Sequence, residues 1–107
     1  MIISKKEKDI LEKRGIGVYE QDTFYELEQW TNGGVNMFIN IWKEEKSSLV
    51  EQLERYIDEF DIDNEIDMYR QDEDYKSNFT ITRSLEDFGD WLEYIKSIIE
   101  DLKKEGK

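Results

Sequence analysis

The chain has 107 residues, and its 27 acidic side chains against 15 basic ones give a formal net charge of −12. It contains no Cys and no His, which excludes disulfides, thiolate and imidazole metal ligands, and catalysis by a Cys or by a Ser–His pair. A charge of this sign repels nucleic-acid phosphates and anionic lipid headgroups. We therefore expect no direct binding to nucleic acid or membrane, and we expect a basic protein surface as the partner.

The composition also predicts how the chain is organised. No Pro-rich or Gly/Ser-rich segment divides it, so we expect one domain spanning residues 1–107. Its three Trp, six Tyr and five Phe provide apolar surface for a core, although 39% of the residues are charged. No apolar run reaches the length of a membrane span, and the apolar start at residues 1–3 is too short for a secretion signal. A cytoplasmic protein is therefore expected.

A short helix and a β-hairpin are the first elements expected along the chain. Residues 4–14 suit a peripheral helix, because Gly15 can end it. Between residues 23 and 42, apolar residues alternate on either side of the turn Asn32-Gly33-Gly34, which predicts two antiparallel strands.

A three-residue loop at this turn also sets the register of the hairpin and puts its apolar side chains on one face. The opposed pairs are Tyr25 with Ile41, Leu27 with Ile39, Gln29 with Met37, and Thr31 with Val35. The second face carries Phe24, Trp30, Phe38 and Trp42, interleaved with Glu26, Glu28, Asn36 and Asn40. The alternative is a helix over residues 23–30, but the regular alternation of residues 35–42 requires a partner strand.

Two longer amphipathic helices follow the hairpin. Residues 48–60 carry apolar side chains at helical spacing, and Ser48 with Glu51 forms a capping box at their start. The longest helical pattern runs from Ser84 to about residue 104, where Asp87 supplies the acid of a second start signal.

These elements predict the α+β class. We expect an antiparallel β-hairpin covered by the two amphipathic helices, with the short N-terminal helix at the periphery. The β-branched residues of 79–82 either add a third strand, which gives a three-stranded sheet, or lead into the last helix.

The densest charge lies between residues 58 and 74, where nine acids stand against one base, Arg70. The alternate acids from Asp61 onward superficially resemble a calcium-binding loop whose twelfth position is Asp72. The match is poor, because Ile66 stands where such a loop needs Gly for its sharp turn. We expect no metal or cofactor, and a weak divalent-cation binder is kept as an alternative. The segment is otherwise a solvated connector or a rigid acidic surface for a basic partner.

The last helix carries a second acidic row. Its acids span 15 residue steps from Glu86 to Asp101, which is about 23 Å, or one charge per roughly 4 Å. One DNA strand carries a phosphate every 3.4 Å or so along its axis. The similar density indicates a surface that could occupy a cationic nucleic-acid groove, with simple solubility as the competing interpretation.

The aromatic residues of the second hairpin face, Trp30, Phe38 and Trp42, allow two interpretations. Such residues are usually buried by a covering element, here the N-terminal helix. If they are exposed beside the acids, they are suited to anchor a protein interface.

Three stretches carry a resemblance to known proteins. They are Trp30-Thr31-Asn32-Gly33-Gly34-Val35-Asn36-Met37, the segment from Phe60 to Tyr75 with Arg70-Gln71-Asp72, and the segment from Phe79 to Phe88 with Ser84-Leu85-Glu86-Asp87. Through them the sequence resembles small uncharacterised acidic proteins of Firmicutes phages and mobile genetic elements, over about the last 80 residues. No assigned activity comes with the resemblance. Proteins of that setting include DNA-mimicking inhibitors of restriction and CRISPR systems, and the charge here is similar in kind.

The sequence therefore predicts a non-enzymatic protein-binding module, monomeric or homodimeric. The sharper hypothesis is an inhibitor that docks its acids into the basic cleft of a nuclease or another nucleic-acid-handling enzyme. The alternative from another class is a self-associating structural protein that uses its aromatic face. No catalytic residue is expected. The candidate partner-binding residues are Asp61, Asp63, Glu65, Asp67, Asp72, Glu73, Asp74, Glu86, Asp90, Glu93, Trp30, Phe38 and Trp42.

Overall fold

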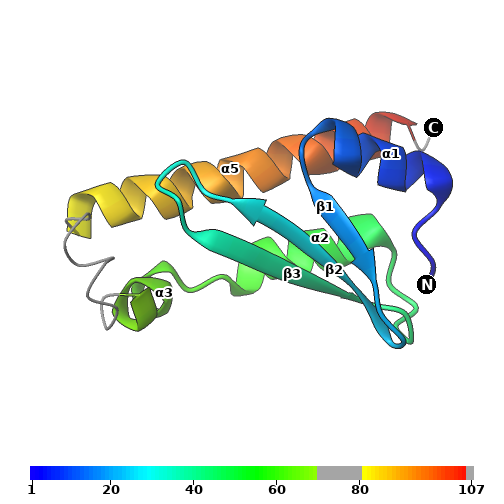
Figure 1. The fold of residues 1–107 in the computed structure, drawn as a ribbon, viewed down its shortest axis with the longest axis horizontal. Coiled ribbons are helices and arrows are strands. Elements are labelled where there is room, and N and C mark those ends of the chain that lie inside the picture. Colours follow the sequence, from blue (N-terminus) through cyan, green and yellow to red (C-terminus); the bar gives the residue numbers. More distant parts are fainter. Residues whose placement is uncertain (70–80, 106–107) are drawn as a thin grey trace.

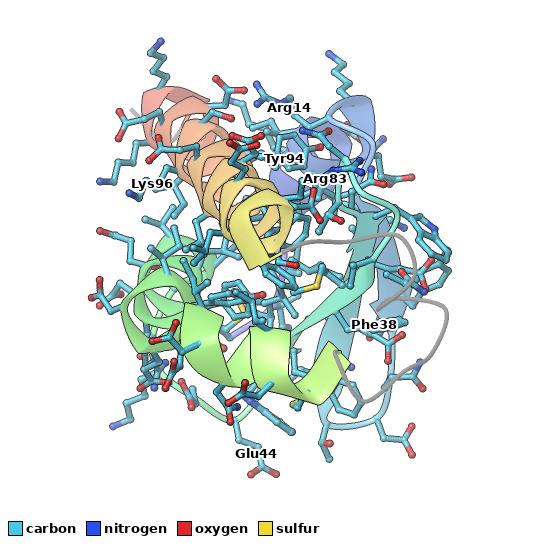
Figure 2. All side chains as sticks on the ribbon, turned by 90° about the vertical axis from the view of Figure 1, so that its left-hand side faces the viewer. Arg14, Phe38, Glu44, Arg83, Tyr94 and Lys96 are labelled. Atoms are coloured by element: carbon cyan, nitrogen blue, oxygen red, sulfur yellow. The ribbon has the colours of Figure 1, made fainter. Side chains whose placement is uncertain are left out.

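The structure is a computed structural model that describes residues 1–69 and 81–105. Its elements are α1 (Lys5–Lys13), β1 (Gly17–Glu20), β2 (Phe24–Trp30), β3 (Asn36–Trp42), α2 (Leu49–Glu59), α3 (Ile62–Tyr69) and α5 (Ile81–Glu105). The strands form one antiparallel sheet in the order β1-β2-β3. Figure 1 shows α5 running along the length of this sheet, and Figure 2 shows α2 and α5 on the same side of it. The predicted α+β class is confirmed, and the sheet has three strands.

The hairpin of β2 and β3 has the predicted register. Tyr25 lies opposite Ile41, and Leu27 lies opposite Ile39. At the turn, the Thr31 N–H donates to the Val35 carbonyl oxygen at 2.8 Å, and Gly34 takes a positive φ of 89° that suits a residue without a Cβ. The alternative of a helix over residues 23–30 is therefore wrong.

The third strand is β1, which the sequence analysis did not predict. Val18 pairs with Leu27 and Tyr19 pairs with Glu26. The segment 79–82 was the alternative predicted for a third strand. This prediction is wrong at residues 81 and 82, which are the first residues of α5. Residues 79–80 lie outside the described residues. A four-residue β-branched segment is too short to override the helix that continues from it.

The predicted helix ends at α1 and α2 are confirmed. Ser4 forms a capping box with Glu7 before α1, and Gly15 follows this helix with a φ of 83°. Ser48 forms the predicted capping box with Glu51 before α2. The start predicted for α5 is wrong, because this helix begins at Ile81 and Ser84 lies inside it, completely buried.

One hydrophobic cluster fills the space between the sheet and the helices. The sheet and the β2–β3 turn contribute Tyr25, Leu27, Val35, Met37, Ile39 and Ile41; α2 and α3 contribute Leu49, Leu53 and Ile66; and α5 contributes Phe88, Trp91, Ile95, Ile98, Ile99 and Leu102. Leu11 of α1 also belongs to it, with 1% of its surface exposed. The alternating residues of the strands and the three-to-four spacing of the helices therefore converge on one core.

The position of α1 corrects a second expectation. This helix contacts β1 and α5, and it lies beside the C-terminal half of α5 (Figure 1). Arg14 fastens it there through Asp101, with 2.8 Å between Nη1 and Oδ2, and its guanidinium lies 5.5 Å from the centre of the Tyr94 ring (Figure 2). Because Leu11 and Ile3 enter the common core, α1 does not cover the second face of the hairpin.

Candidate protein-binding surface

The side of the sheet away from the helices carries a group of exposed aromatic residues. We call this side the outer face; its residues are Tyr19, Phe24, Glu26, Glu28, Trp30, Asn36, Phe38, Asn40 and Trp42. Trp30 is 57% exposed, Phe38 47% and Trp42 43%, whereas Ile39 on the core side is 3% exposed. Large apolar side chains at this exposure on adjacent strands form a patch of the kind found at interaction sites.

The strand register determines how the outer face is laid out. Phe24 lies opposite Trp42, and their ring centroids are 5.2 Å apart with the rings tilted. In the next row of this face Glu26 lies opposite Asn40, and in the row after that Glu28 lies opposite Phe38. Since adjacent strands are about 4.8 Å apart, aromatic rings and carboxylates of neighbouring strands are in reach of the same partner side chain.

The charge of the outer face is purely negative. Glu26 and Glu28 lie on its central strand, and the face contains no Lys or Arg. The nearby Lys43 is engaged elsewhere: its Nζ lies 2.7 Å from Glu20 Oε2 and 5.0 Å from the centre of the Tyr25 ring, which faces the core. The outer face therefore combines aromatic rings with carboxylates and suits a partner with apolar and cationic groups.

Two contacts that the sequence did not predict hold the outer face in place. The buried carboxylate of Asp87 accepts a hydrogen bond from the Thr31 hydroxyl at 2.6 Å and another from the Gly33 N–H at 2.7 Å, which fixes the β2–β3 turn to α5. The Gln52 side-chain amide accepts from the Trp42 N–H at 2.8 Å and donates to the Trp42 carbonyl at 3.1 Å. Both contacts join residues far apart in sequence, so no local signal could have shown them.

The candidate acids at residues 61–67 lie on or beside a helix. Asp61 precedes α3 and accepts a hydrogen bond from the Asn64 N–H at 3.1 Å, so it caps the helix. Burial, and then the neighbouring charge of Asp61, raise the pKa of Glu65 above its ordinary value. The extended backbone of a calcium-binding loop is not found at residues 62–69, because they are helical. Asp63 and Asp67 lie one turn apart on one face of α3, and Glu65 lies on another face. Within residues 1–69 and 81–105, no three acids are grouped as a metal site requires.

The acidic row of α5 is less regular than its sequence suggested. Asp87 is buried, Glu93 lies 3.2 Å from Lys96 Nζ, and Asp101 is paired with Arg14. Glu86 and Asp90 are exposed. A charge every 4 Å is therefore not presented to solvent along this helix. The candidate residues Asp72, Glu73 and Asp74 lie outside the described part of the chain.

The structure thus separates the candidate residues into two groups. The aromatic residues lie on the outer face, and the described acids lie on the helices. One acid bridges the groups, because Asp90 and Trp30 line the same surface cavity of about 310 Å³, together with Tyr94. Phe24 was placed on this face from the sequence but was not named as a candidate, and Tyr19 was not singled out at all. The pairing of β1 with β2 places Tyr19 on the outer face, opposite Glu26.

Comparison of the chain with protein-family models, with curated proteins and with solved structures found no match. The resemblance to acidic phage proteins therefore stays a prediction. None of the described helices combines the length and apolar character that crossing a membrane requires.

Proposed function

We propose that the protein is a non-enzymatic binding module whose outer face docks onto a protein surface that carries apolar and basic side chains. The observation that carries this proposal is the exposure of Tyr19, Trp30, Phe38 and Trp42 on one side of a sheet whose other side packs against the core. Exposed Trp and Tyr rings lose little conformational entropy on binding and are the residues most often found as interface anchors.

The outer face alone is smaller than a standard protein interface. Strands of 7 residues are about 24 Å long at 3.4 Å per residue, and three strands at 4.8 Å spacing present roughly 300 Å². A standard interface buries about 800 Å² on each partner. Docking therefore draws in surface beside the outer face, and Asp90 in the cavity next to Trp30 is positioned to contribute.

Charge favours a basic partner over a second copy of the chain. Two outer faces brought together would oppose two copies of Glu26 and Glu28 with no cation on either side, between molecules that each carry −12. Like charges placed opposite one another across an interface are unfavourable. Self-association through the aromatic face remains the alternative, and sedimentation at increasing salt tests it.

The finer proposal is that the basic partner is a nucleic-acid-handling enzyme that the protein inhibits. Its support is the segment of α2 and α3 between residues 58 and 67, which has six acids and no base. These acids are Asp58, Glu59, Asp61, Asp63, Glu65 and Asp67. A field of this strength speeds encounter with a cationic cleft and weakens with salt.

The test is capture of basic proteins by the immobilised protein and by a matched pair of variants. The first variant changes Trp30, Phe38 and Trp42 to Ser, and the second changes Leu85, which is 44% exposed on α5, to Ser. We expect the triple variant to lose the captured protein and Leu85→Ser to keep it. Displacement of the captured protein by a short DNA duplex would support the finer proposal. Equal capture by both variants, or no capture by the unchanged protein, would show that the outer face is not the docking surface.

A further inference from the structure

The edge of β3 that faces away from β2 has backbone groups that no residue of 1–69 or 81–105 pairs with. The Lys43 N–H donates to the Thr23 carbonyl, and the Thr31 N–H donates to the Val35 carbonyl, so the odd-numbered residues of this strand bond toward β2. Because hydrogen bonding alternates along an antiparallel strand, the N–H and C=O groups of Asn36, Phe38 and Asn40 point the other way. Figure 1 shows β3 at the border of the sheet, and no described strand pairs with that edge.

Trp42, the last residue of β3, shows how outward backbone groups of this strand can be satisfied. Its backbone N–H and C=O also point away from β2, and both are hydrogen-bonded to the side-chain amide of Gln52. This amide presents one acceptor and one donor, as a neighbouring strand would. The contact stops at Trp42, so the three preceding outward positions lack an equivalent partner among the described residues.

The sequence of β3 contains none of the devices that usually protect a strand edge. Its residues are Asn36-Met37-Phe38-Ile39-Asn40-Ile41-Trp42, with no charge and no Pro. Exposed edges are normally blocked by a Lys, a Pro or a bulge, because an open edge recruits another strand. In a chain with 39% charged residues, an uncharged strand of 7 residues is a marked exception at an edge that no described strand covers.

A groove runs beside this edge on the side of α2. It has a volume of about 220 Å³ and is lined by Ile39, Tyr56, Glu59 and the Glu45–Arg55 ion pair, among others. A strand added to β3 would place alternate side chains over this groove and the others beside Phe38 on the outer face. Glu59 has no ion-pair partner among the described residues, so the groove suits one apolar and one cationic side chain.

We infer that the edge of β3 at Asn36, Phe38 and Asn40 receives an extended segment of a basic partner protein as a fourth antiparallel strand. The inference rests on the proposed function and deepens it, because it names the form in which the partner binds. Backbone hydrogen bonds supply an attachment that is independent of side-chain identity, and the aromatic and acidic groups on either side select the sequence. The added strand also extends the contact beyond the roughly 300 Å² of the outer face.

A second copy of the chain fits this edge less well. The core-side residues Met37 and Ile39 of its β3 are buried within its own core, so they cannot lie over the groove. Its strand also carries no cation to meet Glu59. A partner segment in which apolar and basic residues come in pairs, so that each face of the added strand carries both types, satisfies both conditions.

The experiment uses a synthetic nine-residue peptide of repeating Ile-Ile-Lys-Lys as the probe, which carries both residue types on each face of a strand, in 0.15 M salt. Binding is followed by NMR of the ¹⁵N-labelled protein. We expect the amide signals of Phe38 and Asn40 to shift most and their hydrogen exchange to slow. Asn40→Pro removes an outward N–H that no described residue uses, and Pro is tolerated at such edge positions. We expect this variant to bind the peptide about tenfold more weakly, and Asn40→Thr, which keeps the N–H, to bind it within about twofold.

Two modified peptides test the same hydrogen bonds on the unchanged protein. One peptide is methylated on the backbone nitrogens that point to one edge of the strand, and the other peptide on those that point to the opposite edge. Their side chains and charge are therefore identical. We expect one of them to bind at least about tenfold more weakly than the other. Equal binding of both, or shifts confined to α2, α3 and α5, would overturn strand addition but leave docking on the outer face intact. A dimer in sedimentation that Asn40→Pro dissociates would also overturn it, because a second copy would then occupy the edge.

Discussion

The two faces of the sheet are built from alternate residues of the same strands, yet they have opposite environments. Ile39 on β3 is 3% exposed, and its neighbour Phe38 is 47% exposed. The helices cover one face with aliphatic and aromatic residues that are buried, while the other face keeps exposed rings that are as apolar as those of the core. A domain that needed these rings only for stability would bury them, because burying a Phe or Trp contributes about 1.5–3 kcal/mol. The proposed binding role of the outer face rests on this difference in exposure, while the core face serves folding.

The largest expected effect compares these neighbours directly. Ile39→Ala should lower the free energy of unfolding by about 2–5 kcal/mol, since it removes buried methylene groups and leaves a cavity. Phe38→Ala should change it by less than about 1 kcal/mol, because half of the ring is already exposed. Urea denaturation followed by circular dichroism measures both. Similar losses for the two variants would mean that the outer face is part of the core.

The next effect concerns the contact that joins the hairpin turn to α5. Asp87→Ala leaves the Thr31 hydroxyl and the Gly33 N–H without their acceptor, and we expect a loss of about 2–3 kcal/mol. Asp90→Ala, one turn away on the same helix and exposed, is the matched control and should stay within about 0.5 kcal/mol. If the Asp87 variant were as stable as the control, the turn would not depend on this contact.

A smaller effect is expected at the start of α2, on the helix side of the sheet. Ser48→Ala removes the side-chain acceptor of the Glu51 N–H, and we expect a cost of about 1 kcal/mol. Peptide binding at the β3 edge should be unchanged, because Ser48 contributes to α2 and not to the edge. A parallel loss of stability and binding would argue that the two sides of the sheet are not separable.

The pH dependence of stability gives a further contrast, between two glutamates. The hydrogen bond from the Ser48 backbone N–H, helped by its side chain, lowers the pKa of Glu51. The contribution of ionised Glu51 is therefore complete above its ordinary pKa and is lost as the pH falls through the lowered folded-state pKa. Glu51→Gln should remove this part of the acid sensitivity, as measured by urea unfolding at a series of pH values.

The pKa of Glu65 is shifted in the opposite direction, and we expect its effect on stability to be the smallest. Its pKa is raised by burial and by Asp61, so the ionised form is unfavourable in the folded state at neutral pH. This penalty disappears as the pH falls through the raised pKa. We expect Glu65→Gln to stabilise the protein at pH 7 by about 0.2–0.5 kcal/mol, the size of one like-charge pair on a helix, and to have no effect at pH 3. A loss of stability at pH 7 would contradict the assigned sign.

Local patterns predicted those parts of the fold that depend on neighbouring residues. The Asn32-Gly33-Gly34 turn gave the correct hairpin register, and the Ser48–Glu51 box gave the correct start of α2. The start of α5 failed because Ser84 and Asp87 suit a helix cap by type, but tertiary contacts bury both inside the helix. β1 was missed because its 4 residues are too short for a clear alternation.

The sequence predicted which residues share the outer face, but it did not predict whether that face is exposed. Trp30, Phe38 and Trp42 were correctly grouped by alternation on a common face. Whether that face is covered depends on where α1 packs, and this is decided by Leu11 and Arg14 meeting residues of α5 far along the chain. The acids of α5 were overestimated as a continuous row, because sequence spacing does not reveal the ion pair of Asp101 with Arg14.

The most direct test of the central proposal is hydroxyl-radical footprinting of the protein, free and in complex with the basic protein that it captures. We predict that Trp30, Phe38 and Trp42 become protected in the complex, while the exposed Leu85 and Met68 keep their reactivity. Protection of Leu85 or Met68 with unchanged reactivity at the three aromatic residues would contradict the proposal and place the binding surface on the helices.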